Sequence, residues 1–215
     1  MEESTIKEKV LKRIRNALIS KMPNPYPNVD MGGAVFEAVS DGLDVSFAEE
    51  LTKVGGHFIF CENREEMVAN LGLLIQAHHF QPVFCHHKQL FNQLVEAGIP
   101  VENDPRHFAE VKAAVTYCEF LIARSGSVMV SSLSGPGRKI NVFPEVHIVL
   151  AHSKQLVPDL KNAFSLLRQK YPERLPSMVS VITGPSRTAD IEKTLIMGAH
   201  GPKELYVFLT DEMDS

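Results

Sequence analysis

From about residue 45, short apolar runs alternate with amphipathic stretches, and this alternation limits the fold more than any other feature of the chain. Apolar runs of four to eight residues predict buried strands, whereas apolar positions spaced three or four residues apart predict helices. Strands and helices that follow one another in this way favour an α/β domain. Its sheet should be mostly parallel, with helices on both faces.

The alternation predicts the following elements. Strands are expected at residues 57–61, 81–86, 127–132, 146–151, 177–183 and 204–210. Helices are expected at residues 48–54, 64–78, 88–98, 158–170 and 188–198. The apolar stretch AAVTYCEFLIA, residues 113–123, shows no internal boundary.

The N-terminal part of the chain has a different pattern. Ile6, Val10, Ile14 and Leu18 form one apolar stripe on a predicted helix, and the proline-rich segment KMPNPYPNVD follows it. We therefore divide the chain into an N-terminal helix with its linker, residues 1–30, and an α/β domain, residues 31–215. The helix can pack on its own domain or reach a neighbouring subunit in a homodimer, and the sequence permits both.

Composition and charge narrow the class of protein. Apolar residues make up 44% of the chain and charged residues 22%, which is typical of a globular protein. The formal net charge of −4 divides into +3 for residues 1–21 and −7 for the remainder. The body lacks the Lys/Arg stripe with interleaved aromatic residues that nucleic-acid binding requires, so no nucleic-acid partner is predicted.

Three cysteines, Cys61, Cys85 and Cys118, lie far apart and form no CxxC motif. This spacing predicts neither a disulfide framework nor an iron–sulfur or zinc site in the chain, and we expect no metal. The first twenty residues have no continuous apolar stretch, and no segment has the length of a membrane span. A cytoplasmic location is the resulting expectation.

Two loops are placed to bind a ligand. In α/β sheets, ligands bind at the carboxyl ends of strands, where loops and helix N-termini offer unpaired amides. One candidate is ARSGSVMVSSLSGPGRKI, which starts at Ala123, and the other is TGPSRTADIE, which starts at Thr183. Neither loop matches the GxxxxGK[ST] or GxGxxG pattern, so a standard nucleotide site is not predicted.

In the second loop, Ser186 or Thr188 can cap the predicted helix at 188–198, with Glu192 in one of its first turns. Arg187 is unusual beside a helix N-terminus, because its charge opposes the helix dipole unless an anion lies between them. The alternative is an ordinary capped helix with an arginine that extends into water.

Other polar residues give weaker indications. His78-His79 and His86-His87 are adjacent pairs, whose side chains diverge too far to chelate a metal by themselves. His200 follows the helix predicted at 188–198. Glu145 precedes a predicted strand and can act as an acid, base or nucleophile, although an exposed carboxylate explains it equally well.

A group of motifs resembles the lactate utilization protein C family, the short members of the LUD group. The motifs are Ser125-Gly126-Ser127, Pro144 with His147-Ile148, residues 183–192 (TGPSRTADIE), and Gly198 with His200-Gly201-Pro202. The likeness covers residues 45–210. It implies the fold shared by ribose-5-phosphate isomerase, glucosamine-6-phosphate deaminase and the coenzyme A transferases, with a helical N-terminal extension.

The resemblance also implies a role in bacterial oxidation of L-lactate to pyruvate, together with partner proteins that hold the iron–sulfur clusters. A small anionic ligand is then expected between the two loops. It would contact Gly126, Ser127, Gly184, Ser186, Arg187, Thr188 and His200. Arg124 departs from the family, where many relatives have an acid before the Thr/Ser-Gly pair.

A different class of function remains open. The chain can instead be a stand-alone transferase or isomerase of the same fold, acting on a phosphorylated or acyl substrate. That reaction needs an essential carboxylate, for which Glu145 and Glu192 are the candidates. A regulatory subunit without a ligand is a third reading. The family resemblance assigns no reaction to this component, so whether the chain is catalytic stays open here.

Overall fold

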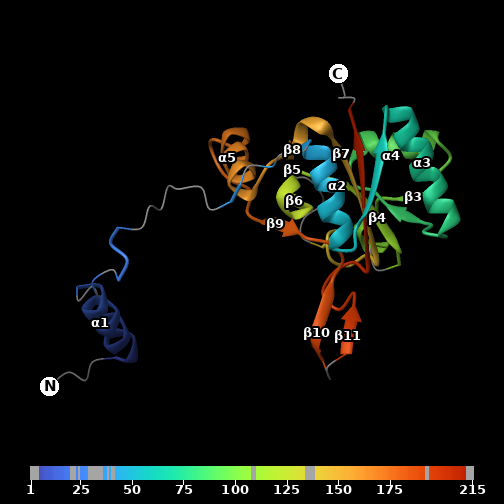
Figure 1. The fold of residues 1–215 in the computed structure, drawn as a ribbon. Coiled ribbons are helices and arrows are strands. Elements are labelled where there is room, and N and C mark those ends of the chain that lie inside the picture. The colour runs from blue at the N-terminus through green and yellow to red at the C-terminus, as the bar shows by residue number, and fades with distance from the viewer. Residues whose placement is uncertain are drawn as a thin grey trace. The chain divides into compact units, whose positions relative to one another are not determined.

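A six-stranded sheet forms the centre of the computed structural model, and all of its pairings are parallel (Figure 1). Its strand order is β1-β12-β7-β4-β2-β3. The strands are β1 (His57–Cys61), β2 (Val83–Phe84), β3 (Val101–Glu102), β4 (Ala113–Tyr117), β7 (Val146–His152) and β12 (Glu204–Thr210). The central strands β7 and β12 are almost wholly buried, as their continuous apolar sequences require.

The structure describes most of the chain, with short gaps. The described residues are 5–19, 23, 25–28, 36–37, 39, 42–107, 110–133, 139–191 and 194–211, with the backbone alone for 188–191 and 194–196. Half of the predicted linker, residues 21, 22, 24, 29 and 30, therefore lies outside the described residues.

Two helices cover one face of the large sheet, α3 (Arg64–Ala77) and α4 (Lys88–Glu96). Asn63 caps α3, because its side-chain oxygen accepts a hydrogen bond from the Glu66 amide at 2.9 Å. Leu71 and Leu90, one from each helix, are fully buried against the sheet. This face is the helix-on-sheet packing that the alternation predicts.

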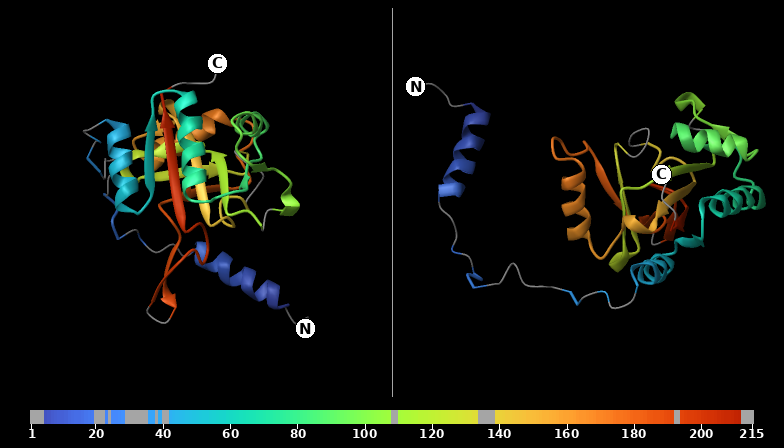
Figure 2. Two further views of the ribbon diagram at one scale, coloured as in Figure 1. Left: turned by 90° about the vertical axis from the view of Figure 1, so that its right-hand side faces the viewer. Right: turned by 90° about the horizontal axis from the view of Figure 1, so that it is seen from above.

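A second, four-stranded sheet covers part of the other face, together with helix α2 (Leu43–Lys53). Its order is β8-β5-β6-β9, and both antiparallel and parallel pairs occur in it. The strands are β5 (Phe120–Ile122), β6 (Ser127–Ser131), β8 (Leu156–Val157) and β9 (Val179–Ile182). Helix α5 (Leu160–Lys170) packs on the outer face of this small sheet. Helices α3 and α4 therefore lie on one side of the two sheets and α5 on the other (Figure 2).

The mixed α/β class with a mostly parallel sheet is thus confirmed. The smaller sheet, which the sequence did not predict, shares the second face of the large sheet with α2. It arises because the apolar run 113–123 divides at Cys118 and Glu119. Strand β4 before that point joins the large sheet, and β5 after it joins the small one. Short 3-10 turns, η1 (Pro105–His107), η2 (Ala123–Ser125) and η3 (Ser153–Gln155), complete these connections.

The predicted helix at 188–198 is wrong. The segment forms an antiparallel hairpin of β10 (Arg187–Ile191) and β11 (Thr194–Met197), which extends away from both sheets (Figure 1). The Ser186 carbonyl accepts a hydrogen bond from the Gly198 amide at 3.0 Å, so the start and end of the segment are tied together. Frequent β-branched residues also favour strands over a helix here.

The chain divides into two units, Met1–Glu37 and Ala38–Ser215, and each is described by itself. The first contains helix α1 (Ile6–Ile19), as the spacing of its apolar residues predicts. None of the residues of α1 is buried. Within the described residues, no helix has the length and apolar character needed to cross a membrane.

Candidate functional site

The predicted ligand loops meet at the C-terminal end of α2. Gly126 and Gly184 follow β5 and β9 of the small sheet, and both have left-handed backbone angles, with φ of 55° and 74°. A Cβ atom on Gly126 would overlap the backbone of Glu50 and Leu51, and one on Gly184 would overlap the Val54 carbonyl. Both glycines are therefore required where the turns approach the α2 backbone.

Arg187 contacts this same helix end. Its guanidinium donates a hydrogen bond to the Val54 carbonyl oxygen at 2.9 Å, and Val54 is the C-cap residue of α2. A cation at a helix C-terminus stabilises the unpaired carbonyls there. Since residues 188–198 are not a helix, the predicted conflict between Arg187 and a helix N-terminus does not exist. Ligand binding by Arg187 stays a prediction.

Ser186 connects the TGPSRTADIE motif, to which it belongs, with the HGP motif at residues 200–202. Its hydroxyl oxygen accepts a hydrogen bond from the His200 amide at 3.3 Å, and its own amide donates to the Pro202 carbonyl at 2.8 Å. Ser127 lies nearby in a chain of hydroxyl groups, 2.8 Å from both Ser125 and Thr183. The structure thus brings the predicted loops together, while the side chain of Thr188 lies outside the description.

Of the two carboxylates proposed as catalytic groups, Glu145 lies within the described residues, and its catalytic role stays a prediction. Glu145 is half-exposed, and its carboxylate lies 2.6 Å from the Lys203 ammonium. The hydrogen bond from Lys203 and its positive charge lower the pKa of Glu145, so the group is a weak general acid. It also precedes β7, at the amino edge of the large sheet. Glu192 lies outside the described residues.

The order of strands identifies a different location for a site. From β2 the chain continues outward to the edge strand β3, whereas from β4 it continues in the opposite direction, towards β7. Because β2 and β4 are neighbours, their connections diverge and leave a crevice at their carboxyl ends. Such switch points are where open α/β sheets bind ligands.

A cavity of about 470 Å³ lies at this switch point. We call it the switch-point cavity, and it is the size of a small-molecule site. It is lined by His86, His87, Lys88, Val115, Thr116, Tyr117, Cys118, Glu119, Leu133, Ile140, Lys170 and Tyr171. These residues come from the ends of β2 and β4, the start of α4, the end of α5 and the segments beside β6 and β7.

Glu119 is the central polar group of the cavity, with only 1% of its side chain exposed. Three donors bind its carboxylate. The Ser131 hydroxyl lies at 2.6 Å, the Lys170 ammonium at 2.8 Å and the Tyr171 hydroxyl at 3.1 Å. A buried carboxylate is stable when it is paired and hydrogen-bonded in this way. The network holds the Lys170 ammonium at the cavity wall.

The ionisation of the neighbouring groups follows from their surroundings. Burial by itself lowers the pKa of Lys170, but the hydrogen bond and attraction to Glu119 outweigh it, and the net shift is upward. Half of the Lys170 side chain remains exposed. Burial raises the pKa of the Cys118 thiol to about 12, so this cysteine stays protonated and is not a nucleophile.

Helix α4 begins at the cavity with exposed cationic or polar side chains. His87 is its N-cap, and the His87 Nδ1 atom accepts a hydrogen bond from the Leu90 amide at 3.5 Å. The neutral ring then carries its proton on Nε2, where it can donate to a ligand. Lys88 and His86 lie beside it on the cavity wall. The N-terminus of α4, the two lysines Lys88 and Lys170, and His87 together favour the binding of a small anion.

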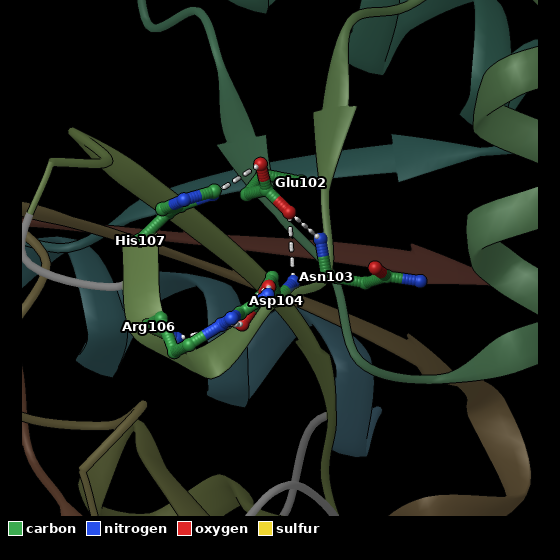
Figure 3. Close-up of polar contacts among 5 residues, drawn as sticks. All are labelled: Glu102, Asn103, Asp104, Arg106 and His107. Atoms are coloured by element: carbon green, nitrogen blue, oxygen red, sulfur yellow. Dashed lines mark hydrogen bonds and ion pairs between the residues drawn. The ribbon is translucent and has the colours of Figure 1, made fainter.

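A polar cluster follows the edge strand β3, as Figure 3 shows. Glu102 accepts hydrogen bonds from the amides of Asn103 and Asp104 at 2.8 and 2.7 Å and lies 3.1 Å from His107. Asp104 binds Arg106 in turn. The backbone and His107 contacts lower the pKa of Glu102. Because all partners come from one short turn, we assign this cluster to the structure of the loop.

Another hollow of the surface lies apart from the switch-point cavity. A groove of about 560 Å³ between α3 and α4 has a mainly aliphatic lining with Arg64, Glu65 and Glu96 at its rim, and it lies outside the sheet's crevice. Among the described residues, no group of three or more His, Cys, Asp or Glu side chains could hold a metal ion.

Glu119, Lys170 and Tyr171 were not predicted from the sequence as residues of a site. Glu119 is the single charged residue in the apolar run 113–123, and a charge in such a run is a usable signal of a buried, paired carboxylate. Lys170 is about fifty residues away from Glu119 in the chain. Only the packing of α5 on the small sheet brings the two together.

Comparisons with known proteins agree with this fold. The family model described as LUD domain matches residues 45–210. Lactate utilization protein C of Anoxybacillus flavithermus is 30% identical over 193 residues, which cover 82% of this chain and 85% of that protein. Lactate utilization protein C of Bacillus subtilis is 32% identical over 113 residues, 51% of this chain and 47% of that protein.

Among solved structures, a DUF162 family protein from Deinococcus radiodurans has a similar fold. The TM-score is 0.60, the identity is 16%, and the match covers 78% of this chain and 96% of that one. At this identity the likeness concerns the fold alone.

Proposed function

Because this chain belongs to the LUD domain family, we propose that it serves in lactate utilization by binding a small carboxylate anion in the switch-point cavity. Lactate and pyruvate are the ligands of first choice. The name of its relatives supports the pathway, and the cationic wall of the cavity supports the kind of ligand.

The observation that carries the proposal is the placement of Lys170. Glu119, which the Tyr171 hydroxyl also binds, holds this lysine's ammonium group at the wall of a cavity that His87 and Lys88 line as well. A carboxylate ligand would accept hydrogen bonds from Lys170 and from the α4 amides. Its hydroxyl or keto oxygen would contact the Nε2–H of His87.

Calorimetric titration of the purified chain with L-lactate and with pyruvate tests this site. Lys88→Ala and Lys170→Met should each weaken binding about tenfold, since each removes a charge-assisted hydrogen bond. Lys161→Ala, an exposed lysine on the same helix α5, is the matched control and should bind normally. Unchanged affinity in both cavity variants would contradict the site.

The same titration decides between the cavity and the loops predicted from sequence. If Gly126, Ser127, Gly184, Ser186, Arg187, Thr188 and His200 bind the ligand, Arg187→Ala should abolish binding and the cavity variants should not. We expect Arg187→Ala to bind normally, because its guanidinium already contacts Val54.

We further propose that the chain acts with partner proteins that carry iron–sulfur clusters. The resemblance to the lactate utilization protein C family implies such partners, and relatives that bear this name support a role in the same system. Affinity purification of the chain from its native source, followed by mass spectrometry and visible absorption, tests it. Partners with cysteine-rich cluster motifs are expected. Repeated isolation of the chain alone would contradict the proposal.

Glu119 is also relevant to the alternative function, a stand-alone transferase or isomerase. A transferase or isomerase of this fold needs a carboxylate in its site, and Glu119 meets that need better than Glu145 does. Turnover of an acyl or phosphorylated substrate by the isolated chain, lost in Glu119→Gln and kept in Glu145→Gln, would favour this alternative.

A further inference from the structure

Helix α1 has an apolar side and a mainly cationic side. At about 100° per residue, Ile6, Ala17, Val10, Ile14 and Leu18 fall within an arc of about 120°. Lys7 lies within this arc near the first turn. Within the N-terminal unit, taken by itself, Ile6 is exposed to 83% and Leu18 to 67%. An apolar face of this kind requires something to cover it.

The opposite face of α1 is mainly cationic. Lys9, Lys12 and Arg15 lie on it together with Glu8 and Ile19, and Arg13 borders the apolar arc beside Ile6. Five basic residues against one acid give the helix a charge of +4, and the full chain has −4, so the remainder has −8. The helix thus has a net positive charge, whereas the rest of the chain has a net negative one.

The position of these cations distinguishes between the surfaces that α1 could cover. A helix seated in a protein groove directs its polar face into water, so cations on that face gain little from the groove. An anionic lipid surface acts differently, because its potential extends about a Debye length and attracts every cation of a helix lying in its plane. An apolar arc with three cations on the opposite face, and two more at or within the edges of the arc, is the pattern of an interfacial helix.

We propose that α1 binds reversibly to anionic lipid surfaces, with Ile6, Val10, Ile14 and Leu18 inserted at the headgroup boundary. A helix of 14 residues is only marginally stable alone in water, so an apolar surface also stabilises its fold. A short helix without aromatic anchors gives weak binding, which the cations strengthen. This inference is independent of the proposed ligand and pathway.

Flotation of the full chain with lipid vesicles tests the proposal. Vesicles of phosphatidylcholine containing about 30% phosphatidylglycerol should carry the protein at least about tenfold better than pure phosphatidylcholine. Ile14→Asp, in the apolar arc, and Lys12→Glu, on the cationic face, should each lower the bound fraction about tenfold. High salt should release the wild-type protein.

Lys161→Glu is the matched control, because it makes the same charge change on an exposed position of α5 and should float as the wild type does. Light scattering and duplex DNA binding are measured on the same variants. The proposal is overturned if the wild type does not float, or if it floats equally well with neutral vesicles. It is also overturned if Ile14→Asp changes only the oligomeric state, or if Lys12→Glu abolishes only DNA binding.

Discussion

Two glycines with left-handed backbone angles differ in what surrounds them. Gly126 has a φ of 55° and Gly98 a φ of 73°. A Cβ atom at Gly126 would overlap the Leu51 backbone, whereas no atom lies within 4 Å of a Cβ at Gly98. A residue with a side chain would therefore be strained in its backbone at either position. Of the two, only position 126 would add a steric conflict.

We therefore expect Gly126→Ala to lower the free energy of unfolding by about 3 kcal/mol or more, because the α2 backbone cannot move aside without loss of packing. Gly98→Ala should cost about 1 kcal/mol, from backbone strain only. Urea denaturation of both variants measures the difference. Equal losses would show that the turn and α2 are not in close contact.

Two glutamates paired with lysines offer a second comparison, one buried and one exposed. Glu119→Gln should destabilise the protein by about 2 kcal/mol, because it removes a buried charge from a network of three donors. Glu145→Gln should cost less than about 0.5 kcal/mol, since its ion pair with Lys203 is solvated. Chemical denaturation at neutral pH provides both values. Similar costs would argue against a buried Glu119.

At the scale of elements, Arg187 links the hairpin β10–β11 to helix α2. Arg187→Ala should lower the free energy of unfolding by about 0.5 kcal/mol, because the Val54 carbonyl at the helix end loses a cationic partner. The loss should shrink at high salt, which screens an exposed charge. Lys161→Ala, which faces water on α5, should have no measurable effect under the same conditions.

The hairpin itself makes a direct structural prediction. In an NMR spectrum, the backbone of Thr188 should show cross-strand contacts to Ile196, and Arg187 to Met197, as the antiparallel register requires. Chemical shifts of both segments should be those of extended chain. Contacts between residues three apart, the signature of a helix, would restore the original prediction for residues 188–198.

The elements found from sequence are those whose own side chains decide their structure. Strands β7 and β12 are long apolar runs, and helix α3 combines a periodic apolar face with an Asn63 cap. The N-terminal half of α2 was missed, although Leu43, Phe47 and Leu51 share its buried face at four-residue spacing. Strands β3 and β8 have two residues each, too few for a period to be recognised.

For the whole molecule, the buried histidine of the large sheet predicts how stability depends on pH. His147 is fully buried in β7, with Nε2 at 2.8 Å from the Thr116 hydroxyl, and burial lowers its pKa from 6.5 to about 4. The unfolded chain therefore binds more protons than the folded chain between these two values. Stability from this group is lost as the pH falls through that window.

The total loss attributable to His147 should reach about 3 kcal/mol by the acid end of the window. Urea denaturation at a series of pH values should show a steeper decline for the wild type than for His147→Gln. His200→Gln, which changes an exposed histidine, should keep the wild-type dependence. Identical slopes in the wild type and His147→Gln would show that His147 is accessible to water.

The sequence by itself determined the α/β class, most of the strands and helices, the amphipathic α1 and the family motifs. These properties depend on the period of apolar residues and on short runs of specific residues, which are local. It also located Gly126, Gly184 and Arg187 as special positions, for which ligand binding stays a prediction.

Only the tertiary structure decided where these residues meet. The small sheet, the contact of Arg187 with Val54 and the network of Glu119 with Lys170 and Tyr171 all join segments far apart in the chain. Strand order likewise placed the cavity between β2 and β4. Such contacts depend on how elements pack, and one chain's local pattern carries no information about which distant residues will become neighbours.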